Sequence, residues 1–459
     1  MSTIADTVRL QRSFFAQGYT HNPAFRLKAL RKLRRAILSM QPEIISALYK
    51  DLGKSSSESY MTEIGMVLSE IRYMERHLQQ FSAPSLRPSP AAQFPSVSYV
   101  LREPYGTVLI MSPWNYPFML ALEPAVDAIA AGNTVVIKPA SYAPSVSHII
   151  QKLISSCLSP CLAAVVEGGR DANQDLLDQH FDYIFFTGSQ TVGRLVMEKA
   201  AAHLTPVTLE LGGKSPCIVD ATANLKVAAD RIVFGKLLNL GQTCVAPDYL
   251  LVEESVKEPL IRELRRAIVR QFGRNPLNNP HYGRIINVKH YHRLLRLLKA
   301  ESSYIGGEHD DASGRIAPAL LDHATPESPC MQEEIFGPLL PILTFRHYAD
   351  ALRIIEQHPT PLALYLFSDP YNYEARRLFL THVRFGGGCV NDTIVHLATN
   401  HMGFGGIGTS GMGSYHGKAG FYTFTHEKSI LDKALYPDLP IRYQPYNKLK
   451  DSLVKFFMK

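Results

Sequence analysis

The chain has 459 residues, of which 46% are hydrophobic and 19% are charged, and its formal net charge is +7. This length exceeds one ordinary hydrophobic core, so we expect two or three domains, and the composition excludes a disordered or fibrous protein. The net charge is small, and much of it lies on an amphipathic stretch at 26–35 and at the end of the chain, so no nucleic-acid partner is expected.

The six cysteines are scattered without a disulfide pattern, which is typical of a reducing compartment. Cys157 and Cys161 lie four residues apart, but no second Cys/His pair at metal-ligand spacing accompanies them, so no metal site is expected. Asp6 and Arg9 lie where a signal peptide needs an apolar run, and no stretch reaches the roughly 18 apolar residues of a membrane span. We therefore expect a soluble, cytoplasmic protein without a transmembrane segment.

Helical spacing of apolar residues predicts helices at the start of the chain. Their predicted ranges are 8–16, 23–40, 42–52 and 57–80. The run SAPSLRPSPAAQFP at 82–95 is rich in proline, so it is not expected to hold a regular element and should be a linker or an extended arm. The alternating run at 96–104 should be an edge strand. An arm that leaves its own domain often pairs with a partner subunit.

From residue 106 onward, short apolar strands alternate with helices. The predicted strands are at 107–111, 134–138, 163–168 and 182–186, and the predicted helices are at 118–131, 144–158 and 192–203. This alternation predicts an α/β fold with a doubly wound parallel sheet. Such sheets bind ligands beyond the carboxyl ends of their strands.

Distinctive residues follow three of these strands. They are Trp114, Asn115 and Tyr116 after the first strand, Lys138 at the end of the second, and Gly188, Ser189 and Gly193 after the fourth. Small residues at a helix start let backbone N–H groups approach a phosphate. The signal is weak by itself, because a simple turn with a helix cap gives the same pattern and the GxGxxG fingerprint is absent.

Cys244 lies in a short polar turn, GQTCVAPDY, between a helical pattern at 232–240 and a strand pattern at 249–253. A cysteine held by rigid flanks, but not buried within one, can keep a lowered pKa and act as a nucleophile. A core cysteine, which is the commoner kind, behaves as an inert small hydrophobe. The rest of the chain decides between these two interpretations.

Six motifs occur in order over about three quarters of the chain: PWNYP, IKPAS, FTGSxxVG, LELGGKSP, GQTC and EIFGP. Together they resemble the NAD(P)-dependent aldehyde dehydrogenase superfamily. GQTCVAPDY and SGMGSYHGKAGF are similar to its class 3 branch, which acts on fatty and aromatic aldehydes. The resemblance implies an aldehyde dehydrogenase-like fold with a cofactor-binding domain at 1–82 and 103–209 and a catalytic domain at 210–396. It also implies an oligomerisation flap with a carboxyl-terminal segment at 83–102 and 397–440, and the basic tail at 441–459 follows.

The resemblance assigns chemistry to individual residues. Cys244 would attack the aldehyde to form a thiohemiacetal, and hydride loss would leave a thioester. The side chain of Asn115 and the backbone N–H of Cys244 would hold the oxyanion. Glu210 would be the general base that activates water, although in the class 3 branch the division of labour between Glu210 and Glu334 is less settled.

The implied cofactor is NAD or NADP. The residues implied to bind it are Trp114, Lys138, Ser141, Gly188, Ser189, Gly193, Glu334 and Phe336, and Tyr116 is assigned to the substrate. Ser141 stands where the family commonly has a glutamate that binds the adenosine ribose. Without the negative charge of that glutamate, the 2′-phosphate of NADP is not repelled. We therefore expect the enzyme to use NADP at least as well as a typical relative does.

Two other activities are compatible with these residues: a thiol esterase and a CoA-acylating aldehyde dehydrogenase. A binding protein that has lost activity is disfavoured because Cys244 and Asn115 are both present. The proline-rich arm and the class 3 likeness predict a homodimer. Residues 446–459 can form a basic amphipathic helix, which either packs on the protein itself or contacts a membrane surface.

Overall fold

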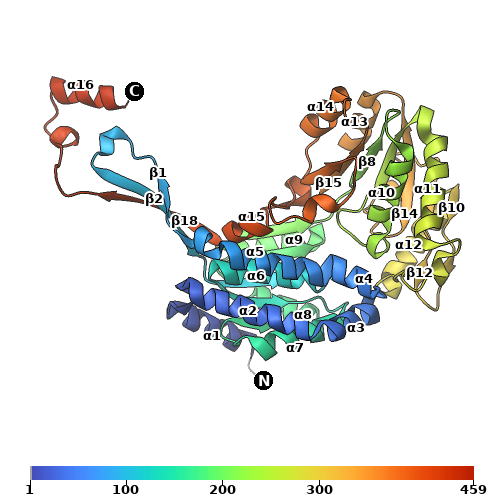
Figure 1. Cartoon of the computed structure of the whole chain (residues 1–459), viewed down its shortest axis with the longest axis horizontal. Coiled ribbons are helices and arrows are strands. Elements are labelled where there is room, and N and C mark those ends of the chain that lie inside the picture. Colours follow the sequence, from blue (N-terminus) through green and yellow to red (C-terminus); the bar gives the residue numbers. More distant parts are fainter. Residues whose placement is uncertain (1–2, 459) are drawn as a thin grey trace.

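The computed structural model describes residues 3–458. Two α/β bodies lie side by side, and a narrow arm of β-strands projects away from them (Figure 1). Each body is built around its own sheet, and the arm forms a third sheet. The predicted α/β class with a doubly wound parallel sheet is confirmed.

The first body contains a six-stranded sheet in the order β17-β7-β6-β3-β4-β5. Its strands are β3 (Thr107–Met111), β4 (Thr134–Lys138), β5 (Ala163–Val165), β6 (Tyr183–Gly188), β7 (Val207–Leu211) and β17 (Gly411–Met412). All pairs are parallel except β17 with β7. The sheet runs past the predicted boundary at 209/210, and β17 returns to it from the segment assigned to the flap.

Helices cover this sheet. They are α1 (Ile4–Ala16), α2 (Pro23–Ser39), α3 (Gln41–Leu52), α6 (Met119–Ala131), α7 (Pro144–Cys157), α8 (Arg170–Leu177) and α9 (Gln190–Ala201). All except α8, which was not predicted, lie where the apolar spacing predicted them, with ends shifted by a few residues. The helix predicted at 57–80 is present, but a π-helical turn interrupts it. The chain forms α4 (Ser56–Ser59), a π-helical turn (Tyr60–Ile64) and α5 (Gly65–Ser82). The turn carries the buried Glu63, which accepts hydrogen bonds from the N–H groups of Phe118 and Met119 at the start of α6.

The second body contains a seven-stranded sheet in the order β10-β13-β14-β9-β8-β15-β16. Its strands are β8 (Pro216–Val219), β9 (Tyr249–Glu253), β10 (Tyr304–Gly306), β13 (Ala319–Leu321), β14 (Leu339–Phe345), β15 (Ala363–Phe367) and β16 (Gly387–Val390). Five helices pack around it: α10 (Leu225–Leu237), α11 (Lys257–Phe272), α12 (Val288–Ala300), α13 (Tyr348–Glu356) and α14 (Tyr373–His382). A two-stranded ribbon, β11 (His309–Asp310) with β12 (Arg315–Ile316), lies beside the sheet.

The arm corrects two expectations. The proline-rich run does hold a short strand, β1 (Ser85–Arg87), and a 3₁₀ turn (Ala91–Gln93). The strand β2 (Ser96–Pro104) is central and not an edge strand, because β18 (Thr425–Lys433) pairs with it along its whole length. Sequence alternation at 96–104 contained no sign of this partner, which lies more than 300 residues further along the chain.

The carboxyl-terminal segment returns along the arm. After α15 (Gly417–Thr423) and β18, it ends in α16 (Lys448–Phe457) at the tip of the arm (Figure 1). The predicted tail helix is therefore present, although Lys459 lies outside the described residues. None of the helices in residues 3–458 combines the length and apolar character that a bilayer crossing needs.

Candidate active site

A cleft of about 590 Å³ lies where the two bodies meet. The first body contributes the turns after β3, β6 and β7, and the second contributes the turn before β9 and the loop before β14. Residues on this cleft include Trp114, Asn115, Gly188, Ser189, Glu210, Cys244, Glu334 and Phe336. The structure therefore brings together eight of the residues singled out from the sequence.

A second cavity, of about 230 Å³, lies on the other side of the cysteine and has an almost entirely apolar lining. Its walls include Met66, Tyr116, Met119, Leu120, Phe234, Leu238, Val245, Ile394, Leu397 and Phe404. Among the described residues, Cys244 is the only one that lines both spaces. A thiol at this junction can meet a polar ligand on one side and an apolar ligand on the other.

The turn that presents Cys244 is rigid. Asn239 and Leu240 both adopt left-handed backbone conformations, with φ of 51° and 54°, directly after α10. The side chain of Asn239 stabilises the turn by donating hydrogen bonds to the carbonyls of Asn115 (2.7 Å) and Gln242 (3.1 Å). Strained conformations of this kind persist where the surroundings fix them, and they cluster at functional sites.

The lowered pKa expected for Cys244 is wrong for this state of the protein. Burial raises the pKa of the thiol to about 12, and the nearby carboxylates of Glu334 and Glu210 add to this effect. The sequence showed an exposed polar turn, whereas the turn is enclosed by both bodies. The thiol is therefore protonated at neutral pH, and its reaction requires a group that accepts the proton.

Asn115 is buried, and its backbone and side chain are both held in place. Its Nδ2 donates a hydrogen bond of 3.1 Å to the carbonyl of Gln242, while its Oδ1 has no partner. An amide nitrogen has two hydrogens, so one N–H remains free for a ligand in the cleft that Cys244 also lines. Next to it, the hydroxyl of Tyr116 is 2.6 Å from the hydroxyl of Thr243 on the wall of the apolar cavity.

Two carboxylates lie on the cleft. Glu210, at the end of β7, is 2% exposed, both of its oxygens lack a partner, and burial raises its pKa well above the usual range. Glu334 lies against Gly212: a Cβ added to this glycine would be only 2.1 Å from Oε2 of Glu334. Burial, followed by the charge of Asp248, raises the pKa of Glu334 to about 8. Both groups can therefore act as bases once deprotonated.

A buried ion pair supports the loop that carries Glu334. Lys214 pairs with Asp248, and its Nζ also donates to the carbonyls of Cys330 and Glu333, each at 2.9 Å. Asp248 in turn accepts a hydrogen bond of 2.9 Å from the N–H of Ile335. Bonds on both sides of Glu334 thus fix its position relative to the cysteine.

Three of the predicted cofactor residues do not line the cleft. Gly193 is buried in α9, and a Cβ there would be 2.8 Å from Leu211, so this glycine allows α9 to pack on β7. Lys138 is 3% exposed, and its Nζ donates to the carbonyl of Pro139 at 2.7 Å. Ser141 is exposed beyond the end of β4. Their roles toward a cofactor stay predictions.

Several residues of the site were missed from the sequence. His290 and Arg293, on α12, line the cleft, and the ring of His290 lies 5.0 Å from that of Trp114. Burial lowers the pKa of His290 to about 4, so it is neutral. Arg293 donates to the carbonyl of Glu334 at 3.2 Å. The only signal in the sequence was an amphipathic helix, which is typical of many packed helices.

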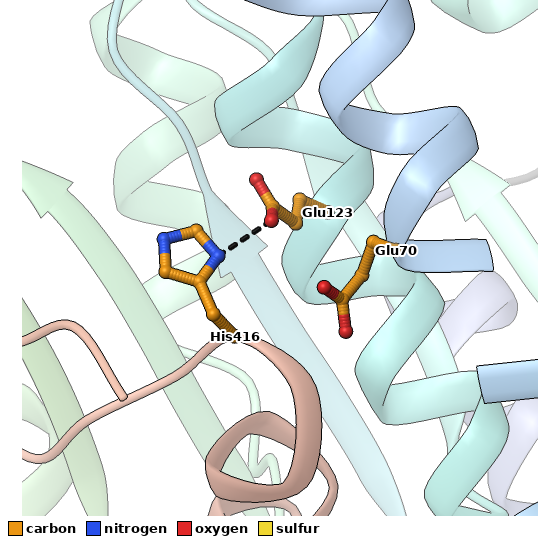
Figure 2. Close-up of side chains that lie close together, drawn as sticks. All are labelled: Glu70, Glu123 and His416. Carbon is orange, nitrogen blue, oxygen red and sulfur yellow. Dashed lines mark hydrogen bonds and ion pairs between the residues drawn. The ribbon is translucent and has the colours of Figure 1, made fainter. Parts of the chain in front are cut away.

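A cluster of buried charged side chains lies behind the apolar cavity, where α5, α6 and the turn before α15 meet (Figure 2). His416, which lines the cavity, is 2.5 Å from Glu123 through its Nδ1, and Glu70 accepts a hydrogen bond of 2.9 Å from the N–H of Gly417. One ligand atom from each of the three residues lies within 4.8 Å of the others. Hydrogen bonds occupy both oxygens of Glu70 and join Glu123 to His416, although Oε2 of Glu123 has no partner. Because these bonds join three separate elements, we interpret the cluster as an anchor for the cavity wall.

The cleft suits an elongated polar ligand such as a nicotinamide dinucleotide. Thr187, Glu210 and Asn115 each present a buried oxygen without a hydrogen-bond partner on its lining. The N-terminus of α9, capped by Ser189, also opens on the cleft and provides a positive helix-dipole end for phosphate. The aromatic rings of Trp114 and Phe336, 5.3 Å apart, form an apolar patch beside Glu334.

These features place a cysteine thiol between a dinucleotide-sized cleft and an apolar cavity. The chain belongs to the aldehyde dehydrogenase family, whose family model matches residues 6–430. It is 49% identical over 450 residues to the 4,4'-diaponeurosporen-aldehyde dehydrogenase of Staphylococcus aureus, covering 98% of this chain and 97% of that relative. It is 41% identical to aldehyde dehydrogenase family 3 member A2 of Mus musculus, covering 97% and 92% of the two chains. The class 3 likeness is confirmed.

A solved structure, the substrate-bound state of Staphylococcus aureus AldH, matches with a TM-score of 0.98 and 47% identity over the full length of both chains. The predicted fold, the enzyme class and the use of NAD or NADP are confirmed by these likenesses. The protein is an NAD(P)-dependent aldehyde dehydrogenase.

Proposed function

We propose that Cys244 is the nucleophile with which this enzyme oxidises medium-chain, long-chain or aromatic aldehydes to carboxylic acids. The observation that carries the proposal is that, within residues 3–458, Cys244 alone borders both the polar cleft and the apolar cavity. The lining of the cavity favours an apolar chain or ring, while the carbonyl group would lie at the thiol.

In the first step, a deprotonated carboxylate on the cleft, Glu210 or Glu334, takes the proton of the Cys244 thiol. The sulfur attacks the aldehyde carbon, a C–S bond forms, and the carbonyl oxygen takes up the electron pair. The free N–H of Asn115 and the backbone N–H of Cys244 would stabilise this oxyanion. A bound nicotinamide would supply the hydride acceptor, and loss of the hydride would leave a thioester on Cys244. Trp114, Phe336 and Glu334 would hold the nicotinamide end of the cofactor in the cleft.

In the second step, a carboxylate removes a proton from water as the water attacks the thioester carbon. The C–S bond breaks, the acid leaves, and the sulfur regains a proton. Glu210 is proposed as this base because it lines the cleft with two unpartnered oxygens. Glu334 is the second candidate, because its pKa of about 8 also suits proton transfer near neutral pH.

The separate sheets support the proposed division into a cofactor-binding domain, a catalytic domain and a flap. The projecting arm supports a homodimer, because its exposed apolar side chains, including Leu86, Phe94 and Val97, would be covered by a partner. The cysteines among the described residues are all free, which agrees with a cytoplasmic location.

The tail is proposed to pack on the arm and, on its open side, to contact an anionic membrane surface. Phe457 and Met458 line a small cavity at the tip of the arm together with Phe94. Leu449 and Phe456 are 69% and 73% exposed on a helix that carries several lysines. Such a helix has the composition of an interfacial element.

The test is to add aldehydes of increasing chain length and aromatic aldehydes with NAD or NADP, and to follow the near-ultraviolet absorbance of the reduced nicotinamide. We expect activity in the wild type and none in Cys244→Ala, whose fold, checked by circular dichroism, should be unchanged. Retention of activity in this variant would overturn the proposal. Turnover only in the presence of coenzyme A would indicate the acylating alternative, and ester cleavage without any aldehyde oxidation would indicate the esterase.

A further inference from the structure

A carboxylate that the sequence did not single out lies beside Lys138. Strands β4 and β5 are paired in parallel, with Ile137 opposite Val165, and the N–H of Val166 donates a hydrogen bond of 2.9 Å to the carbonyl of Ile137. This register places Glu167 next to Lys138 at the carboxyl end of the sheet. The negative charge of Glu167 acts on the Lys138 ammonium, whose pKa burial lowers to about 8.

Glu167 is available to a ligand. Its side chain is 40% exposed, and its ion-pair partner, His148, is 72% exposed and 3.9 Å away. That distance is too long for a hydrogen bond, so the carboxylate keeps its accepting capacity. Gly168, directly after it, has a φ of +132°, a backbone conformation that turns the chain toward α8 immediately beyond the strand end.

We propose that Glu167 makes this enzyme prefer NAD to NADP. The inference rests on the proposed function and on the family resemblance, which implies that Lys138 binds the cofactor and that Ser141 stands at the adenosine ribose. In dinucleotide-binding folds, an acidic residue at a strand end accepts hydrogen bonds from the ribose hydroxyls and repels a 2′-phosphate. Here Ser141 does not supply that charge, and Glu167, from the neighbouring strand, does. This proposal is opposed to the expectation drawn from Ser141 alone, that NADP is well used.

The test measures binding directly, by calorimetric titration of the full-length enzyme with NADH and with NADPH at low salt. We expect the wild type to bind NADH more tightly than NADPH. In Glu167→Gln, the affinity for NADPH relative to that for NADH should rise by about tenfold. This is the size expected when one like charge is removed near a phosphate at a partly exposed site. The shift should shrink at high salt, because exposed charges are screened there.

The matched control is Glu43→Gln, which removes another partly exposed glutamate. Glu43 pairs with Lys152 on α7, the helix that also carries His148. It should leave the ratio unchanged. Ser141→Glu, placed in the Glu167→Gln background, should return the ratio toward NADH. An unchanged ratio in Glu167→Gln, with both cofactors still binding, would overturn the role of Glu167. Failure of the wild type to bind either cofactor would instead overturn the proposed function.

Discussion

The ammonium of Lys54 donates a hydrogen bond of 3.0 Å to the backbone carbonyl of Asn115 and forms an ion pair of 2.5 Å with Glu63. All three side chains are almost fully buried. Glu63 also accepts from the N–H groups at the start of α6, directly after the turn that holds Asn115. The proposed oxyanion donor is thus fixed by a charged pair from the helical start of the chain.

Lys54→Met should destabilise the protein by about 3–5 kcal/mol, because it leaves Glu63 as an uncompensated buried charge. The double variant Lys54→Met, Glu63→Gln should recover part of this loss, since it removes the orphaned charge. Denaturant unfolding followed by circular dichroism measures both free energies. If the double variant is as unstable as the sum of the single variants, the two residues are not coupled in the way the structure indicates.

Asn115→Ala should lower kcat by about 100- to 1000-fold, the usual effect of losing one oxyanion donor. The effect should fall on kcat because the hydrogen bond strengthens only as charge develops on the oxygen. Steady-state kinetics with a saturating aldehyde measures this loss. A change confined to KM would show that Asn115 binds the ground state instead.

Much of the site could be predicted because its chemistry is carried by short motifs at strand ends. Cys244, Asn115, Glu210 and Glu334 all lie on one cleft. Asn115 and Glu210 lie at the carboxyl ends of parallel strands of the first sheet, whereas Cys244 and Glu334 precede strands of the second. The environment of these residues could not be predicted, since it depends on distant segments. The closing of both bodies over Cys244 determines the raised pKa of its thiol, and no local pattern encodes that closure.

Long-range pairing limited the prediction of the fold in the same way. Apolar periodicity located β3, β4 and β6 to within a few residues, because each strand is buried on both faces. The pairing of β18 with β2 left no trace in either segment, because both strands have mixed, partly exposed faces. The π-helical turn before α5 was missed since its residues keep ordinary helical spacing.

Deleting residues 446–459 should reduce co-sedimentation of the protein with vesicles that contain anionic lipid, because it removes the exposed Leu449 and Phe456 together with several lysines. Aldehyde oxidation should be unchanged, since the tail lies at the tip of the arm, away from the cleft (Figure 1). Neutral vesicles are the control. Equal sedimentation of the full-length and shortened proteins would rule out the membrane contact.

Light scattering at micromolar concentration should give the mass of a dimer for the wild type. Replacing Val100 on the central strand of the arm with proline should shift the mass toward that of a monomer. Proline has no N–H for the ladder that joins β2 to its neighbours, so the arm that a partner would cover is distorted. A monomeric wild type would contradict the proposed use of the arm.

The last prediction concerns the base that releases the acid. If Glu210 is that base, Glu210→Gln should stall as a thioester and give a burst of reduced cofactor followed by slow turnover, whereas Glu334→Gln should not stall at this step.

The base acts only when deprotonated, and burial raises the pKa of both carboxyls. Wild-type thioester hydrolysis should therefore be slow at pH values where an ordinary glutamate is already ionised, and should speed up as the pH rises. Stopped-flow measurements across pH separate the burst from the steady rate. Three results together would assign the base to Glu334. Glu210→Gln would keep nearly normal steady turnover, Glu334→Gln would stall as the thioester, and thioester hydrolysis by the wild type would reach half its maximal rate near pH 8.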